Sequence, residues 1–579
     1  MTALGRAGAL LWIGAAVASL AAPAYAQTAA TGTGAPTREE IDRPGLRPDD
    51  RPSRLTIDGE VERAPCPLAG PEYAAITFTL REVQFANLTV LSPDALRSAY
   101  ADYVGQTVPL ATVCEIRDRA ATILRRAGYL AAVQVPPQEI ENGIVRFDVL
   151  VAKLTAVQVR GDAGRSERLV ARFLEQLTEQ PAFNERDAER ALLLLRDLPG
   201  YDIRLTLRPA GTAPGEVIGE VSVVHTPVEV DFSAQNYGSR SVGRFGGLLR
   251  AQVNGLTGLG DRTSLGVYST ADFEEQLVLQ ASHDFALATD GLRLAGRFTH
   301  AWTEPGGTAG LDIESRTLLA GLEATYPFIR RQTGSLFGAF GLDFVNQEID
   351  LVGVTTNRDK LRVVYGRLDA DTSDGGGLFA DPGRLRAGLS LEVRKGLDIL
   401  DATRFVAGSP VQQTRVPGTS KGFVLRGSGV LEFRAAPRVT FWVSPRAQYS
   451  DDPLLSFEEF SAGNYTAGRG YDPGALVGDS GVGVQAELRF GSTQPASVND
   501  VALQGYVFGD HARTWNNRDG LRGSDSLASA GGGIRVAFGD RARLDVAVAV
   551  PLKRLPFATD KPDPRILISL TTRLVPWRR

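Results

Sequence analysis

The chain has 579 residues, of which 43% are hydrophobic, and its 63 lysines and arginines nearly balance its 67 aspartates and glutamates. A formal net charge of −4 excludes the strongly basic balance of a nucleic-acid-binding protein and the charge excess of an acidic tail. Two cysteines and four scattered histidines lack the spacing of metal ligands, so neither a metal nor another cofactor is expected. The length favours several domains, although a single β-barrel can exceed that prior.

Residues 1–26 predict a cleaved export signal. Arg6 precedes an apolar stretch from Ala7 to Leu20, and Ala24-Tyr25-Ala26 comes directly before Gln27, which fits cleavage by signal peptidase. A membrane anchor is the alternative, but the apolar run is shorter than the roughly twenty residues that a span requires. No later segment has a long apolar run, so the exported chain is either periplasmic or crosses a membrane as strands.

Residues 27–65 are rich in proline, threonine, glycine and charge, and their apolar content is too low for them to fold alone. We interpret them as a linker or docking arm with room for one short helix near residues 37–42. Pro44, Pro48 and Pro52 would end such a helix soon after it begins.

Cys66 and Cys114 are the two cysteines of the chain. An even number of cysteines in one region of an exported protein predicts a disulfide. This bond would tie the start of the first folded unit to its second helix. The alternative is a pair of unpaired buried thiols.

Two α+β units follow, at residues 66–153 and 154–227, and both show the order β-α-α-β-β. Ser92-Pro93-Asp94 is typical of a helix start, and Gly128 of a helix end. In the first unit we predict strands 75–84, 131–135 and 145–151 with helices 92–104 and 112–126. In the second we predict strands 154–159, 202–208 and 216–224 with helices 165–177 and 184–198. The repetition supports each prediction.

These two units resemble polypeptide-transport-associated (POTRA) domains over residues 65–226. The resemblance rests on Cys66-Pro67, Gly128-Tyr129-Leu130, Pro136-Pro137-Gln138 and Val159-Arg160-Gly161. It implies periplasmic units that bind an extended peptide by adding it to a sheet edge, through main-chain hydrogen bonds that read little sequence. The alternative is a structural spacer.

Residues 228–579 have the texture of a transmembrane β-barrel. Apolar Val482, Val484, Ala486, Leu488 and Phe490 alternate with Gly483, Gln485, Glu487 and Arg489. A soluble β-sandwich alternates too, but the export signal, strands of about ten residues and an even count of about sixteen antiparallel strands favour a closed membrane barrel. Inward charges imply a lumen that holds water or polypeptide; they are Arg426, Glu432, Arg434, Glu487 and Arg489.

The tetrapeptide Gly468-Arg469-Gly470-Tyr471 places a cation on a sharply turning loop inside this barrel. A charge in a confined lumen is costly unless it is paired, and Asp510 in Tyr506-Val507-Phe508-Gly509-Asp510 is the predicted partner. An ordinary glycine-rich hairpin is the alternative. Gly478-Asp479-Ser480-Gly481 echoes a serine-protease nucleophile loop, but no base is singled out, so no enzyme is expected.

Residues 228–579 resemble the translocators of two-partner secretion, the TpsB family of haemolysin and filamentous-haemagglutinin secretion pores. The residues that carry the resemblance are Asn236-Tyr237-Gly238-Ser239-Arg240, Gly258-Leu259-Gly260-Asp261-Arg262, Arg469-Gly470-Tyr471, Phe508 and Asp510. It implies that Arg469 lies on the sixth extracellular loop, folded into the pore, where Asp510 of the thirteenth strand anchors it. Phe508 supplies an aromatic ring beside them.

The same resemblance implies an outer-membrane protein that captures a large unfolded TpsA-type exoprotein by its periplasmic units and secretes it without nucleotide. We expect outer-membrane lipid around a monomeric barrel and no nucleic acid. Three features depart from the family pattern. The proline-broken arm makes an N-terminal plug helix doubtful, Trp577 is followed by Arg578 and Arg579, and Ala512 stands where glycine is frequent.

Two other functions fit parts of the sequence. An outer-membrane assembly factor shares the loop motif and the barrel, but it usually has three or more periplasmic units, and the sequence shows two. A diffusion porin would not need such units. The sequence identifies neither the client, nor the POTRA edge that binds it, nor whether the client is also activated.

Overall fold

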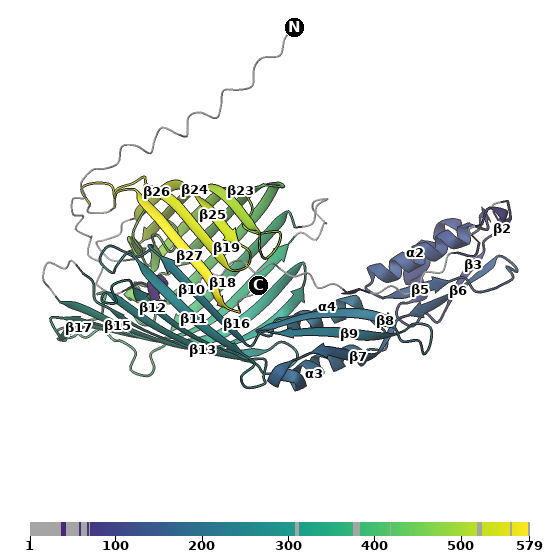
Figure 1. Cartoon of the computed structure of the whole chain (residues 1–579), viewed down its shortest axis with the longest axis horizontal. Coiled ribbons are helices and arrows are strands. Elements are labelled where there is room, and N and C mark those ends of the chain that lie inside the picture. The colour runs from purple at the N-terminus through teal and green to yellow at the C-terminus, as the bar shows by residue number, and fades with distance from the viewer. Residues whose placement is uncertain are drawn as a thin grey trace, which may run out of the picture.

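The computed structural model describes residues 36–41, 57–58, 66–68, 70–73, 75–306, 312–373, 383–416, 418–517, 524–555 and 558–576. The predicted export signal, most of the predicted arm, and Trp577 with the two arginines after it lie outside these residues. Two α+β units extend in a row from one end of a closed β-barrel (Figure 1). The predicted fold class is confirmed.

In the first unit, a three-stranded sheet packs against one long helix. Strand β6 (Ile144–Val151) lies between β3 (Glu82–Ala86), which is parallel to it, and β5 (Ala131–Gln134), which is antiparallel. Helix α2 (Thr112–Arg126) buries Val113, Ile116, Ala120 and Leu124. Their spacing of three to four residues gives the helix one apolar face. Cys66 and Cys114 form a disulfide that fixes the start of the unit to α2.

The segment predicted as helix 92–104 is not one α-helix. It consists of two 3₁₀ turns, η2 (Pro93–Ala99) and η3 (Ala101–Tyr103), separated at Tyr100, whose φ of −134° leaves the helical region. The two buried residues of η2, Leu96 and Ala99, are three apart, which is the repeat of a 3₁₀ helix. The predicted strand 75–84 is also divided, into β2 (Thr77–Thr79), which pairs with β4 (Thr107–Pro109), and β3.

The second unit has two helices on a mixed sheet. Helices α3 (Glu167–Thr178) and α4 (Glu185–Arg196) pack against β7 (Lys153–Gly161), β8 (Tyr201–Pro209) and β9 (Glu216–His225). The start of α4 is capped by Asn184, whose side chain accepts a hydrogen bond from the Arg186 amide, as an N-cap residue should. Strand β9 lies in the middle of the sheet. The outer edge of β8 pairs in parallel with β1 (Ile57–Asp58) from the N-terminal arm.

The barrel has sixteen antiparallel strands and closes where the first, β10, pairs with the last, β27. Three strands, β15 to β17, have 19, 18 and 20 residues, which is longer than the predicted ten. A tilted crossing needs only about ten residues, so these three extend beyond the bilayer. The strands are β10 (Val228–Gln235), β11 (Gly246–Asn254), β12 (Arg262–Thr270), β13 (Gln276–Ala286), β14 (Arg293–Thr303), β15 (Ile313–Arg331), β16 (Gly334–Leu351), β17 (Val354–Ser373), β18 (Leu385–Gly396), β19 (Phe423–Ala436), β20 (Val439–Tyr449), β23 (Ser480–Gly491), β24 (Val501–Trp515), β25 (Ser524–Phe538), β26 (Ala542–Pro551) and β27 (Arg565–Val575).

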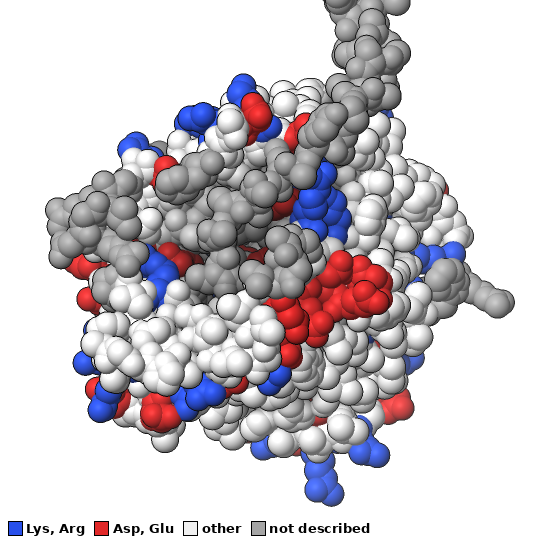
Figure 2. Space-filling view, turned by 90° about the vertical axis from the view of Figure 1, so that its left-hand side faces the viewer, with Lys and Arg blue, Asp and Glu red and all other residues white. Residues whose placement is uncertain are grey.

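The outer wall of the barrel is apolar and its inner wall is charged. Along β24 exposed Val501, Leu503 and Val507 alternate with buried residues, as lipid-facing and lumen-facing positions do in such barrels. Broad areas of uncharged side chains also cover the end of the molecule shown in Figure 2, where charges gather in separate groups. Among the described residues, no helix has the length and apolarity of a membrane span.

The second unit is fixed to one end of the barrel. Arg330 at the end of β15 donates two hydrogen bonds of 2.6 Å to Asp197, just after α4. The Gln332 amide donates to Glu189 of α4 at 2.6 Å. Because strands alternate in direction, the loop after β20 begins at the opposite end of the barrel.

Candidate functional site

The loop of residues 450–479, between β20 and β23, folds back into the lumen. It contains a 3₁₀ turn, η5 (Ser456–Glu458), and a small hairpin of β21 (Phe460–Ala462) and β22 (Leu476–Gly478). Its apolar residues form a buried cluster with two residues of the wall; the members are Phe460, Ala462, Ala467, Tyr471, Leu476, Ala512 and Leu527. The loop therefore packs as part of the barrel interior.

The structure brings Arg469 and Asp510 together. The guanidinium donates to both carboxylate oxygens, Nη2 to Oδ1 at 2.7 Å and Nε to Oδ2 at 3.0 Å, and the Arg469 amide also donates to Oδ2 at 2.9 Å. The Asp510 side chain has no exposed surface. Fork-shaped, charge-assisted contacts of this kind are strong and fix orientation.

The other motif residues hold the loop tip in place. The Phe508 ring lies 3.7 Å from the Arg469 guanidinium carbon, a cation-π contact. A Cβ on Gly470 would lie 2.9 Å from the Pro551 amide nitrogen, so only glycine allows this approach of the two backbones. The Tyr471 hydroxyl accepts from the Lys553 amide at 3.0 Å and lies 2.9 Å from the Ala528 carbonyl oxygen.

Sequence reasoning missed Glu487 as a second partner of Arg469. Its Oε1 accepts from Arg469 Nη1 at 2.5 Å, and the same carboxylate accepts from Arg489 and Arg535. The alternation of β23 already placed Glu487 inside the barrel. Its contact with Arg469 depends on the pairing of Glu487 with Phe508 across β23 and β24, which the sequence of one strand does not contain.

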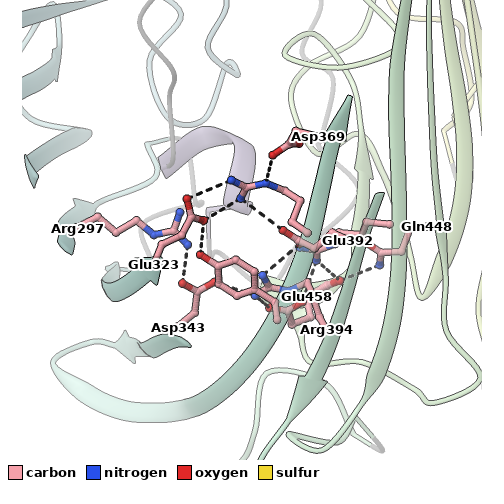
Figure 3. Close-up of polar contacts among 11 residues, drawn as sticks. Arg297, Glu323, Asp343, Asp369, Glu392, Arg394, Gln448 and Glu458 are labelled. Atoms are coloured by element: carbon pink, nitrogen blue, oxygen red, sulfur yellow. Dashed lines mark hydrogen bonds and ion pairs between the residues drawn. The ribbon is translucent and has the colours of Figure 1, made fainter. Parts of the chain in front are cut away.

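A second charged cluster joins the loop to a neighbouring part of the wall, on β18 and β19 (Figure 3). Glu458 of η5 accepts from Arg394 of β18 at 2.8 and 3.1 Å and from Arg426 of β19 at 2.9 Å. Arg394 also donates to Asp343 at 3.0 Å and to Glu392 at 3.3 Å. Sequence reasoning assigned no role to Glu458, because a loop residue has no strand alternation to place it.

A short N-terminal helix, α1 (Arg38–Ile41), lies inside the barrel. Glu39 accepts from Arg446 of β20 at 2.8 Å, and Ile41 is buried in one cluster with Leu455 and Phe457 of the loop. Sequence reasoning doubted a helix in the lumen because of the prolines. The helix in the structure is a single turn that ends at Ile41, before Pro44.

The motif Gly478-Asp479-Ser480-Gly481 makes contacts that hold the backbone in place. Asp479 accepts from Arg415 at 2.6 Å and from the Leu454 amide at 2.7 Å, and the Ser480 hydroxyl bonds to the Ser450 backbone. These contacts hold the two ends of the loop. Within the described residues, no three histidine, cysteine, aspartate or glutamate side chains are grouped to hold a metal ion.

Residues 381–536, which contain the loop, Arg469 and Asp510, match the family described as haemolysin secretion/activation protein ShlB/FhaC/HecB. Residues 78–151 match the ShlB-type POTRA domain. These two matches support a two-partner secretion translocator of the TpsB type. The resemblance stated from the sequence is thus confirmed, as is the outer membrane as its location, with POTRA domains in the periplasm.

Relatives and solved structures are similar to the chain over most of its length. The heme/hemopexin transporter protein HuxB of Haemophilus influenzae strain 86-028NP is 23% identical over 533 residues, covering 89% of this chain and 90% of HuxB. HuxB of strain ATCC 51907 is 23% identical over 542 residues, with the same coverage. CdiB from Escherichia coli shares the fold with a TM-score of 0.70 at 16% identity, over 89% of this chain and 94% of CdiB. CdiB from Acinetobacter baumannii has a TM-score of 0.61 at 17% identity, over 91% and 94%.

The match to the ShlB/FhaC/HecB family model includes the whole lumenal loop. The protein is an outer-membrane translocator, and its partner is a secreted exoprotein of the TpsA type. The lumen through which an exoprotein would pass contains the loop and α1. The contacts of Arg469 and Glu458 therefore hold in place the loop that occupies a large part of the lumen.

Proposed function

We propose that this translocator conducts one unfolded TpsA-type client through its lumen without nucleotide, and that the loop carrying Arg469 must move for the client to pass. The observation that carries the proposal is the contact of Arg469, on the loop inside the lumen, with Asp510 and Glu487 of the wall. Each of these buried charges depends on the other for compensation. The pair therefore acts as a latch that keeps the loop in few positions.

The client would enter at the periplasmic end, where the second POTRA domain meets the barrel. A cavity of about 690 Å³ opens there, and its lining includes Phe173, Asp197, Asn254, Asp284 and Arg293. The POTRA domains would present the client to this mouth as an added strand. Folding of the client outside, worth several kcal/mol, would make the transfer directional.

The proposal extends to the surroundings of the barrel. Since β10 pairs with β27, one copy closes its own wall, and we propose a monomer in outer-membrane lipid. The chain itself performs no catalysis in this scheme. A gene for a large exported protein beside the gene of this chain would identify the client to test.

The first prediction concerns the latch. Arg469→Ala leaves the buried Asp510 without its cation, and Asp510→Ala leaves Arg469 with Glu487 alone. We therefore expect release of the client into the medium to fall at least tenfold while the barrel still inserts. Secretion is measured by the amount of client in culture supernatant, and insertion by heat-modifiable migration of the barrel.

Arg513→Ala is the matched control for this prediction. Arg513 lies on β24, the strand of Asp510, but on the exposed outer face, so its loss should leave secretion unchanged. Normal secretion by both Arg469→Ala and Asp510→Ala would overturn the latch.

A further inference from the structure

The lumenal loop touches the wall through charges of both signs. Its cation, Arg469, contacts two wall anions, Asp510 on β24 and Glu487 on β23. Its anion, Glu458, contacts two wall cations, Arg394 on β18 and Arg426 on β19. Strand β20 separates the two groups of wall residues in the barrel order. The two contacts are therefore different sites with opposite polarity.

The contact of Glu458 with the wall is buried, and hydrogen bonds to the Glu458 backbone reinforce it. Side-chain exposure is 5% for Glu458 and 2% for Arg394, so water hardly screens the pair. The Glu458 backbone carbonyl accepts two more bonds, from Gln448 at 2.8 Å and Arg426 at 3.1 Å. The residue before it, Phe457, is buried in the lumenal cluster that contains Ile41. The backbone carbonyl and the side chain of Glu458, together with the buried Phe457, therefore hold this turn in place.

The charges around Glu458 show what its removal would do. Arg394 has two further anions, Asp343 at 3.0 Å and Glu392 at 3.3 Å, both from wall strands. Without Glu458, Arg394 stays paired to the wall, and the wall can remain intact. The link that disappears is the one between the wall and the loop.

We infer that Glu458 is a second anchor of the lumenal loop, a positioning residue that holds the loop when the Arg469 latch opens. This inference rests on the proposed movement of the loop. A cationic segment in the lumen competes with Arg469 for Asp510 and Glu487, but it cannot replace Glu458 on two arginines. Complete withdrawal of the loop then requires both contacts to break.

The test measures channel opening of the full-length protein, without client, in planar lipid bilayers. Glu458→Gln keeps the shape of the side chain and removes its charge. We expect the frequency of openings to a high-conductance state to rise about tenfold, equivalent to ~1.4 kcal/mol. Glu432→Gln is the control, because Glu432 is a wall carboxylate of β19 whose salt bridge is with Arg489, also of the wall.

Double variants separate one anchor from two. Arg426→Gln added to Glu458→Gln should raise the opening frequency little further, since both changes remove the same contact. Arg469→Ala added to Glu458→Gln should multiply the two effects, to about a hundredfold. If Glu458→Gln does not insert, Arg426→Gln removes one of the two wall cations of Glu458, and a smaller rise in opening frequency is expected because Arg394 remains in contact with Glu458.

Opening of Glu458→Gln at the wild-type frequency, or no more often than Glu432→Gln, overturns the second anchor. If Arg469→Ala raises the opening frequency in that case, the latch of the proposed function stands alone. If neither variant opens more often, the movement of the loop itself is refuted. Secretion is not part of this measurement, so the two proposals fail separately.

Discussion

At the scale of single residues, the sequence predicted one half of the lumenal contacts. Arg469 and Asp510 could be paired because a cation on a glycine-rich turn needs a carboxylate, and a strand with alternating faces offered one. Glu487 was placed in the lumen by the same alternation, but not next to Arg469. Glu458 could not be placed, since its position depends on how η5 packs on β18 and β19. Local sequence patterns do not predict which distant wall residues a loop residue contacts.

A residue-scale prediction concerns His225, at the end of β9. It stacks on Tyr201 at 4.5 Å, and burial lowers the pKa of the His225 imidazole, although Asp162 opposes this. The folded state therefore binds the proton less readily than the unfolded chain. The contribution of His225 to stability is complete above the unfolded pKa of about 6.5 and decreases as pH falls below it.

We therefore expect β9 to exchange its amide hydrogens faster, relative to intrinsic rates, at pH 5.5 than at pH 7.5. His225→Phe keeps the stacking on Tyr201 without a titratable group, so this pH effect should disappear in the variant. Hydrogen exchange of the full-length protein checks both statements. An equal pH effect in the wild type and the variant would exclude His225 as its source.

At the scale of elements, strands were predicted better than the first helix of the first POTRA domain. Lipid imposes strict alternation on every membrane strand, so about sixteen strands could be segmented from the sequence alone. The helix over 92–104 was wrong because Ser92-Pro93 marks a start but contains no information about length. The segment is interrupted at Tyr100, and Leu96 and Ala99 before it are packed in the domain core.

An element-scale prediction concerns the disulfide of the first POTRA domain. Cys66 and Cys114 are separated by 48 residues. In the chain-entropy account, loss of a disulfide that closes a loop of this length destabilises a fold by about 4 kcal/mol. The double variant Cys66→Ser/Cys114→Ser should show faster hydrogen exchange in α2. The second POTRA domain contains no cysteine, and its α3 serves as the internal control. Unchanged exchange in α2 would show that the disulfide does not stabilise this domain.

At the scale of the whole molecule, the N-terminal arm links parts that are far apart in the fold. Its α1 lies in the lumen, its β1 pairs with β8 of the second POTRA domain, and its end is fixed to α2 through Cys66. The sequence predicts this segment as a linker or docking arm with room for one short helix near residues 37–42, where α1 lies. It does not predict where the arm docks, because two-residue strands and one-turn helices leave no periodic signal. Yet β1 covers part of the β8 edge that a client strand could use.

A prediction at this scale follows from that pairing. In a strand, neighbouring amides point to opposite sides, so Ile57→Pro/Asp58→Pro must remove the amide that faces β8. We expect faster hydrogen exchange at Leu205 and Thr206, the partners of β1, and tighter binding of an N-terminal client fragment to the full-length protein. The amides of β3 in the first domain provide the comparison. Equal exchange with and without the prolines would mean that the arm does not protect this edge.

The opposite polarity of the two loop anchors also bears on the permeability barrier of the cell. A pore wide enough for polypeptide would admit large antibiotics if it stood open. Because Arg469 and Glu458 contact different strands with different charges, no single substitution, and no excess of one kind of ion, removes both. If one of the two contacts is lost, the other still holds the loop inside the pore, which limits leakage through the secretion channel.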